Sequence, residues 1–219
     1  MTRGSWALPD PRQAPAGVEL LAVGGPFSAD LAIAGYRRGL FAMEVAAGVM
    51  GWFSPDPRGV LPLGSVPVSR SLKRSMRRYR VTVDTSFAAV VAACADPDRP
   101  GHWITDDYRA VYRDLHSRGV AHSVEVWEGD LLAGGLFGVE LGGLFCGESM
   151  FHRRTDASKV ALVSMARLLA TESADRVFDV QWWTPHLGSM GVVEVPRSRY
   201  LDRVSAALSL PPLLSPPAR

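Results

Sequence analysis

Three strand-like runs follow one another between residues 121 and 151, and only short glycine-containing linkers separate them. The runs cover 121–128, 131–140 and 144–151, with Gly129-Asp130 and Gly142-Gly143 at the joins. Linkers this short favour β-hairpins, so the runs predict an antiparallel meander. An amphipathic helix over 157–172 and strands at 177–180 and 192–195 are expected next. This order indicates an α+β fold with a mixed, largely antiparallel sheet.

The N-terminal part of the chain is expected to form a separate unit. A helix is predicted over 28–40, ending at Gly39, and the prolines and glycine of 51–58 predict a turn-rich stretch. Between this unit and the meander, the pattern predicts a strand at 80–84 and helices over 86–95 and 106–117. We therefore expect a mobile segment 1–17, a small N-terminal domain 18–63, a larger domain 64–208 and a proline-rich tail 209–219.

Composition excludes several classes of protein. No apolar run approaches the ~20 residues of a membrane helix, and residues 1–17 lack a signal-peptide core. The two cysteines, Cys94 and Cys146, are too few for a disulfide framework or a four-thiolate zinc site. The five histidines show no ligand pair with a third donor. We expect a soluble cytoplasmic protein that binds no membrane, metal or cofactor.

The positive charge of the chain is concentrated in one short segment. Residues 70–80 hold six basic residues and no acidic one, so the remainder carries −4 although the whole chain is +2. On a helix beginning after Ser69, the apolar residues of this segment lie opposite a cationic stripe. A solvated helix face is the alternative to a phosphate-binding face. The stripe consists of Arg70, Lys73, Arg74 and Arg77, and Arg78 lies next to it in the sequence.

Glu148 stands in an otherwise apolar strand, where a carboxylate requires a partner. It could form a structural ion pair with Arg153, Arg154 or Lys159, or it could recognise an amine in a cleft. The residues alone favour neither interpretation.

Asp179 and Gln181 are two apart on a predicted strand, so they are expected to share a face. Such a pair suits proton handling or binding of a reacting carbonyl group. On spacing alone, a buried network that fixes the strand end is the stronger interpretation. Cys146 is expected to be an inert packed thiol.

Ordered motifs along 18–208 resemble the bacterial leucyl/phenylalanyl-tRNA–protein transferases. The matching segments are 36–41, 54–58, 68–72, 103–105, 121–125 and 134–138, together with Glu148, Ser158-Lys159 and Gln181. The resemblance implies a small N-terminal domain and a C-terminal domain of the N-acetyltransferase type. The pyrophosphate-binding turn of coenzyme A-dependent acetyltransferases is absent from the sequence, which favours another acyl donor.

The implied reaction transfers Leu, Phe or Met from aminoacyl-tRNA to proteins beginning with Arg or Lys, which marks them for the N-degron pathway. By resemblance, Asp179 and Gln181 act at the reacting centre, Trp103 and Tyr112 lie near the terminal adenosine, and Tyr36 and Met43 lie on the acceptor side. The basic helix would contact tRNA. The implied aminoacyl pocket consists of Leu136, Phe145, Glu148, Met150, Met165 and Leu169.

Four positions depart from the family pattern in or near the N-terminal domain, which leaves acceptor specificity open: Pro26, Ala42, Met43 and Pro67. Two other functions compete with the implied one. One is coenzyme A-dependent N-acyl transfer, and the other is non-catalytic binding of tRNA or of N-degrons. Glu148, Asp179 and Gln181 argue against the second alternative.

Overall fold

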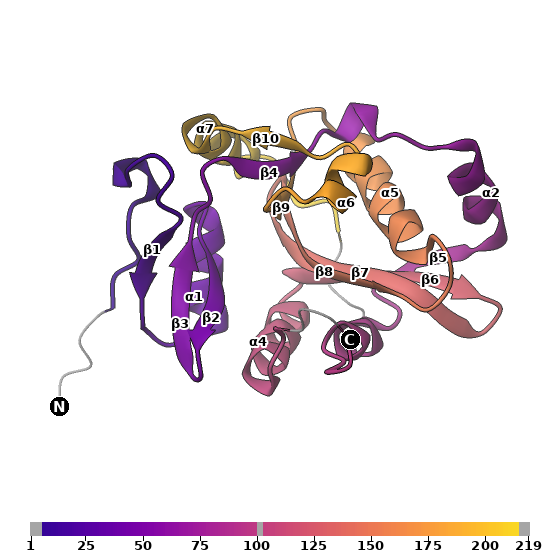
Figure 1. Ribbon diagram of the computed structural model, residues 1–219, viewed down its shortest axis with the longest axis horizontal. Helices are drawn as coiled ribbons and strands as arrows, with labels where there is room; N and C mark the ends of the chain where they lie inside the picture. Colours follow the sequence, from indigo (N-terminus) through magenta and orange to yellow (C-terminus); the bar gives the residue numbers. More distant parts are fainter. Residues whose placement is uncertain (1–5, 100–102, 215–219) are drawn as a thin grey trace.

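The structure, a computed structural model, describes residues 6–99 and 103–214 and contains two sheets (Figure 1). Three strands form a small antiparallel sheet in the order β1-β3-β2, and seven form a larger sheet in the order β10-β4-β9-β8-β7-β6-β5. The strands are β1 (Leu20–Val23), β2 (Phe41–Ala46), β3 (Val49–Phe53), β4 (Arg58–Leu61), β5 (Arg80–Val83), β6 (Ala121–Glu128), β7 (Leu131–Leu141), β8 (Leu144–His152), β9 (Val177–Gln181) and β10 (Val193–Val195). The helices are η1 (Pro11–Gln13), α1 (Ala29–Arg37), η2 (Leu63–Ser65), α2 (Arg70–Arg78), α3 (Phe87–Cys94), α4 (Asp106–Ser117), α5 (Ala157–Ala170), α6 (Pro185–Ser189) and α7 (Arg197–Ala207).

The larger sheet is mixed because one pair of neighbouring strands, β8 and β9, runs parallel. The pairs β10/β4, β4/β9, β5/β6, β6/β7 and β7/β8 are antiparallel. The predicted α+β class and largely antiparallel sheet are therefore confirmed.

Helices cover both faces of this sheet (Figure 1). Adjacent residues of β7 alternate between two apolar cores, as the two-residue period of a strand requires. Leu136 packs with α5 in one core, and Phe137 packs with α3 and α4 in the other. Since both faces are covered, the strands of the meander are apolar along most of their length.

The predicted meander agrees closely with the structure, and the bounds of β6 and α4 match the prediction. The first helix is shorter than expected, and Ser28 caps its first turn by accepting a hydrogen bond from the Leu31 N–H. In the stretch 51–58, predicted to be rich in turns, residues 54–57 form the connection, while the ends of the stretch belong to β3 and β4. Strands β1 and β2 and helices α6 and α7 were not predicted.

The chain passes from the N-terminal sheet to the larger sheet between β3 and β4. Strand β4 lies inside the larger sheet, so the change of sheet falls before the predicted boundary at 63/64. The described part of the first segment is packed, not mobile as expected: Arg197 is buried and donates hydrogen bonds to the carbonyl oxygens of Ala14 and Pro15. The start of the proline-rich tail is also packed, because Glu140 accepts hydrogen bonds from the Leu213 and Leu214 N–H groups.

Candidate active site

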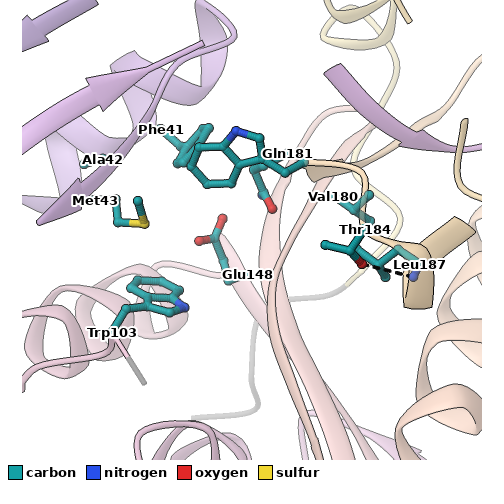
Figure 2. Close-up of a pocket in the computed structure, with 10 residues that line it drawn as sticks. Phe41, Ala42, Met43, Trp103, Glu148, Val180, Gln181, Thr184 and Leu187 are labelled. Carbon is teal, nitrogen blue, oxygen red and sulfur yellow. Dashed lines mark hydrogen bonds between the residues drawn. The ribbon is translucent and has the colours of Figure 1, made fainter. Parts of the chain in front are cut away.

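Two cavities meet beside the ends of β8 and β9. The larger has a volume of about 270 Å³ and the smaller about 110 Å³. They share Glu148, Val180, Gln181 and Leu187 as lining residues. Figure 2 shows Glu148 and Gln181 facing each other across the larger cavity. The other residues lining the larger cavity are Phe41, Ala42, Met43, Trp103, Trp182 and Thr184, and those lining the smaller are Leu136, Gly147, Ser149, Met150, Leu162 and Phe178.

Irregular pairing at the strand ends brings the polar side chains to these cavities. Strands β8 and β9 pair only as far as Cys146 and Asp179. Against β7, Gly147 and Ser149 oppose successive residues, which makes Glu148 the extra residue of a β-bulge. Val180 is likewise the extra residue of β9 against β4. Bulges redirect side chains, and here each bulge lies at or beside a polar residue of the cavity wall.

Glu148 is held by two hydroxyl groups, and no cation among the described residues pairs with it. Tyr36 donates to its Oε1 at 2.8 Å, and Tyr112 donates to its Oε2 at 2.6 Å. Burial raises the pKa of Glu148 to about 7, although these two hydrogen bonds act in the opposite direction. Burial and the nearby Glu148 raise the pKa of both tyrosines well above the ordinary value, so both remain neutral donors.

The ion pair expected as the structural alternative for Glu148 does not form. Arg154 pairs with Glu128 and Lys159 with Asp156, while Arg153 lies over the Phe151 ring. A carboxylate withdrawn from water without a cation is costly to ionise. Glu148 therefore differs from Asp179 and Glu140, buried acidic residues that pair with Arg58 and Arg176.

Asp179 has the opposite surroundings. Its side chain is fully buried and accepts two hydrogen bonds from Arg58, at 2.8 and 2.6 Å. Tyr200 donates to it at 2.8 Å, and the Cys146 thiol lies 3.4 Å away. Burial, together with Asp179, raises the pKa of Cys146 well above its ordinary value, so the thiol stays protonated. Asp179 lines neither cavity.

The prediction that Gln181 and Asp179 share a face of the strand was wrong, because the bulge at Val180 breaks the strand alternation. Asp179 Oδ1 accepts from the Gln181 backbone N–H at 3.0 Å and does not contact its side chain. The Gln181 backbone is left-handed, with φ of 62°, a conformation that few non-glycine residues adopt. The side-chain Nε2 is buried and has no hydrogen-bond partner among the described residues. It is an unused donor in a residue that lines both cavities.

The residues expected around the aminoacyl side chain divide into two groups. Leu136, Glu148 and Met150 line the smaller cavity, whereas the other three are fully buried in the core and line neither cavity: Phe145, Met165 and Leu169. The sequence analysis did not identify three further lining residues, because they have the appearance of ordinary core positions: Leu162, Phe178 and Leu187.

The aromatic residues near the larger cavity also divide. Trp103 and Met43 line it, while Tyr36 and Tyr112 are buried behind it and contact Glu148. Of the four positions that depart from the family pattern, Ala42 and Met43 lie in this wall.

The basic helix is α2, which Ser69 caps as predicted. Leu72 and Tyr79 are buried against α5, and Tyr79 donates to the Thr155 carbonyl oxygen. Arg78 pairs with Glu128. Within residues 6–99 and 103–214, the other four basic side chains of the helix form no ion pair, and all are exposed: Arg70, Lys73, Arg74 and Arg77.

Across those same residues, no helix could cross a membrane, and no group of three His, Cys, Asp or Glu residues could hold a metal ion.

Known proteins are similar to this chain in sequence. Residues 60–205 match the sequence profile of a family described as leucyl/phenylalanyl-tRNA protein transferase. A protein of that name from Oleidesulfovibrio alaskensis is 46% identical over 93% of this chain and 86% of its own length. One from Anaeromyxobacter sp. (strain K) is 46% identical over 94% of this chain and 90% of its own length.

A solved structure of a GCN5-related N-acetyltransferase from Kribbella flavida aligns with 75% of this chain and 60% of its own, at 11% identity and a TM-score of 0.42. The family profile and the sequence relatives confirm the predicted resemblance. The chain belongs to the leucyl/phenylalanyl-tRNA–protein transferase family.

Proposed function

We propose that this protein transfers leucine, phenylalanine or methionine from aminoacyl-tRNA to the α-amine of proteins beginning with Arg or Lys. The product would enter the N-degron pathway, in the cytoplasm. Family membership supports aminoacyl transfer, and the two adjoining cavities provide one place for the donor and one for the acceptor.

The smaller cavity suits the donor side chain. Its wall is largely apolar, and flexible Met150 can adjust to aliphatic or aromatic groups. The larger cavity would receive the terminal adenosine, with Trp103 as a stacking surface. It would also receive the acceptor N-terminus, near Met43. The reacting ester then lies at the shared wall, between Glu148 and Gln181.

The observation that carries this proposal is the buried Nε2 of Gln181, which has no hydrogen-bond partner in the described part of the chain. Rotation of the Gln181 amide would direct this N–H toward the ester carbonyl oxygen, where it would stabilise the negative charge that develops during aminolysis. The donor is an activated ester, so positioning supplies much of the required acceleration. Asp179 is a positioning residue, because it fixes the Gln181 backbone and is itself fixed by Arg58.

Helix α2 would contact the tRNA backbone. Its exposed, unpaired cations suit phosphate groups, which carry no sequence information. Each phosphate contact releases counterions, so tRNA binding should weaken steeply with salt concentration. Replacing Arg70, Lys73, Arg74 and Arg77 with Ala should flatten that salt dependence. An unchanged slope would argue against this surface.

The test uses radiolabelled leucyl-tRNA and two reporter proteins, one beginning with Arg and one with Ala. Label should appear only on the Arg reporter, and ribonuclease treatment should abolish it. Acetyl-coenzyme A in place of the tRNA should give no product.

The variant Gln181→Leu should lower transfer by about 10²-fold, the loss typical of one such donor. Ser189→Ala is a matched control, because its hydroxyl is exposed and donates only to the His186 carbonyl oxygen. Full activity in Gln181→Leu would exclude the proposed role of Gln181. No label on either reporter, with tRNA binding intact, would favour a binding protein without turnover.

A further inference from the structure

We propose that Glu148 is the proton acceptor for the attacking α-ammonium group, an assignment that rests on the proposed function. The first argument is position. Glu148 is one of two residues with a polar side-chain terminus that line both cavities, and the other, Gln181, faces it (Figure 2). A base must lie within hydrogen-bond reach of the proton that it removes, and an amine entering from the larger cavity meets this carboxylate.

The second argument is that the surroundings of Glu148 fit both of its protonation states. When it is ionised, Tyr36 and Tyr112 each donate to one oxygen. The two hydroxyl oxygens lie 3.2 Å apart. A protonated carboxyl can therefore donate to Tyr36, Tyr36 to Tyr112, and Tyr112 to the second carboxyl oxygen. Every hydrogen in this closed ring has an acceptor, so proton uptake leaves no buried polar group unpartnered.

The third argument is the charge around the site. The charged and titratable groups that act on Glu148 are Tyr36 from α1, Tyr112 and Tyr108 from α4, Asp179 from β9, Arg58 from β4 and Cys146 from β8. Arg58 is the one cation in this set, and Asp179 binds it directly. The pKa of Glu148, about 7, lies close to the reference value of roughly 7.7–8.0 for an α-amine. Proton transfer between the two groups is therefore nearly balanced.

The step conserves atoms and charge. One ammonium proton moves to Glu148, and the freed nitrogen lone pair attacks the ester carbonyl carbon to form the C–N bond. As the C–O bond to the terminal ribose breaks, Glu148 returns its proton to the ribose oxygen. The second amine proton leaves to solvent, so the products are an amide, a ribose hydroxyl and one proton.

This role predicts a specific pH profile of kcat/KM for the acceptor protein, measured at saturating leucyl-tRNA. The reactive pair is a carboxylate with an ammonium group. The profile should therefore rise through the pKa of Glu148 and fall through that of the acceptor amine, with a maximum between them. In Glu148→Gln only the free amine reacts, so the profile should rise through the amine pKa and level off. At pH 7, kcat/KM should fall by about 10²-fold.

The matched control is Glu125→Gln. Glu125 is a buried carboxylate that, like Glu148, accepts from hydroxyl groups, those of Ser123, Thr82 and Thr85, but it lines neither cavity. This variant should keep the profile with a maximum. Thermal unfolding establishes that both variants fold.

A Glu148→Gln profile that keeps its maximum and is lowered by one factor at every pH would overturn the inference. A wild-type profile that levels off instead of falling would overturn it too. If the wild-type protein transferred nothing at any pH, the proposed function would fail, and the inference with it.

Discussion

Two carboxylates lie on neighbouring strands of the same sheet, Asp179 fully buried and Glu148 half-buried, and their surroundings differ completely. Asp179, on β9, accepts two hydrogen bonds from a buried guanidinium group. Glu148, on β8, accepts hydrogen bonds from two neutral hydroxyl groups, and no cation of residues 6–99 and 103–214 pairs with it. Asp179 is closed off from both cavities, whereas Glu148 lines both. One carboxylate is compensated inside the protein, and the other is left to interact with whatever enters the site.

This difference separates a structural role from a chemical one. A buried carboxylate that is paired with a cation can fix its neighbours, as Asp179 does for the Gln181 backbone. Glu148, whose pKa burial raises to about 7, gains and loses a proton near neutral pH. Perturbed groups of this kind concentrate at functional sites. The sequence places the two residues in similar apolar strands and offers no means of telling them apart.

The largest effect should follow from removing the cation of Asp179. Arg58→Met leaves a fully buried carboxylate without its partner, so we expect a loss of 3–5 kcal/mol in the free energy of unfolding, on the order of other broken buried pairs. Urea denaturation measures the loss. Arg12→Met, which removes an exposed pair with Asp202, should cost less than about 1 kcal/mol. Equal losses in the two variants would contradict the compensation argument.

The second effect concerns Glu148 and depends on pH. Its pKa is about 7 in the folded protein, above its ordinary value of 4.5. The folded state therefore binds the proton more tightly, and stability should fall as pH rises from about 4.5 to about 7. Glu148→Gln cannot ionise and should lack this fall, which amounts to up to about 3 kcal/mol.

The measurement is the difference in unfolding free energy between wild type and Glu148→Gln, at pH 4 and at pH 8. The unfolding free energy of Glu148→Gln should increase relative to that of wild type as the pH rises. The same difference at both values would mean that Glu148 ionises as readily in the folded protein as in the unfolded chain.

A smaller effect is expected from one hydroxyl group of the Glu148 cluster. Tyr112→Phe removes a hydrogen bond to the carboxylate, which should cost about 1.5–3 kcal/mol at pH 8. It should also raise the pKa of Glu148 and move the rising limb of the activity profile to higher pH. Tyr79→Phe removes a hydroxyl that donates to the neutral Thr155 carbonyl oxygen and should leave that limb in place. An unmoved limb in Tyr112→Phe would separate this hydroxyl from the titration.

The smallest effect should come from the thiol beside Asp179. Cys146→Ala removes a weak contact, while Arg58 and Tyr200 still hold the carboxylate. We expect a loss of about 1 kcal/mol in the free energy of unfolding, typical of a single substitution. The loss should be the same at pH 5 and pH 8, because the raised pKa keeps the thiol protonated at both. A loss as large as that of Arg58→Met would show that the thiol, not the guanidinium group, fixes Asp179.

Parts of the fold were predictable because their signals are local. Strands β6, β7 and β8 have apolar sequences with glycine at the joins, and α2 begins at a capping serine and has two distinct faces. Strand β4 has four residues and lies beside prolines, so its own sequence does not predict a strand. Pairing with β9 and β10 makes it a strand.

The sequence by itself determined the meander, the basic helix and the family, because each depends on residue types at short spacing. Only the tertiary structure decided how the site works. Tyr36 reaches Glu148 across 112 positions of sequence, and Arg58 reaches Asp179 across 121. The bulges at Glu148 and Val180 then override the strand alternation that local spacing predicts. The charge state of a buried group depends on neighbours that come from distant segments, and residue spacing carries no record of them.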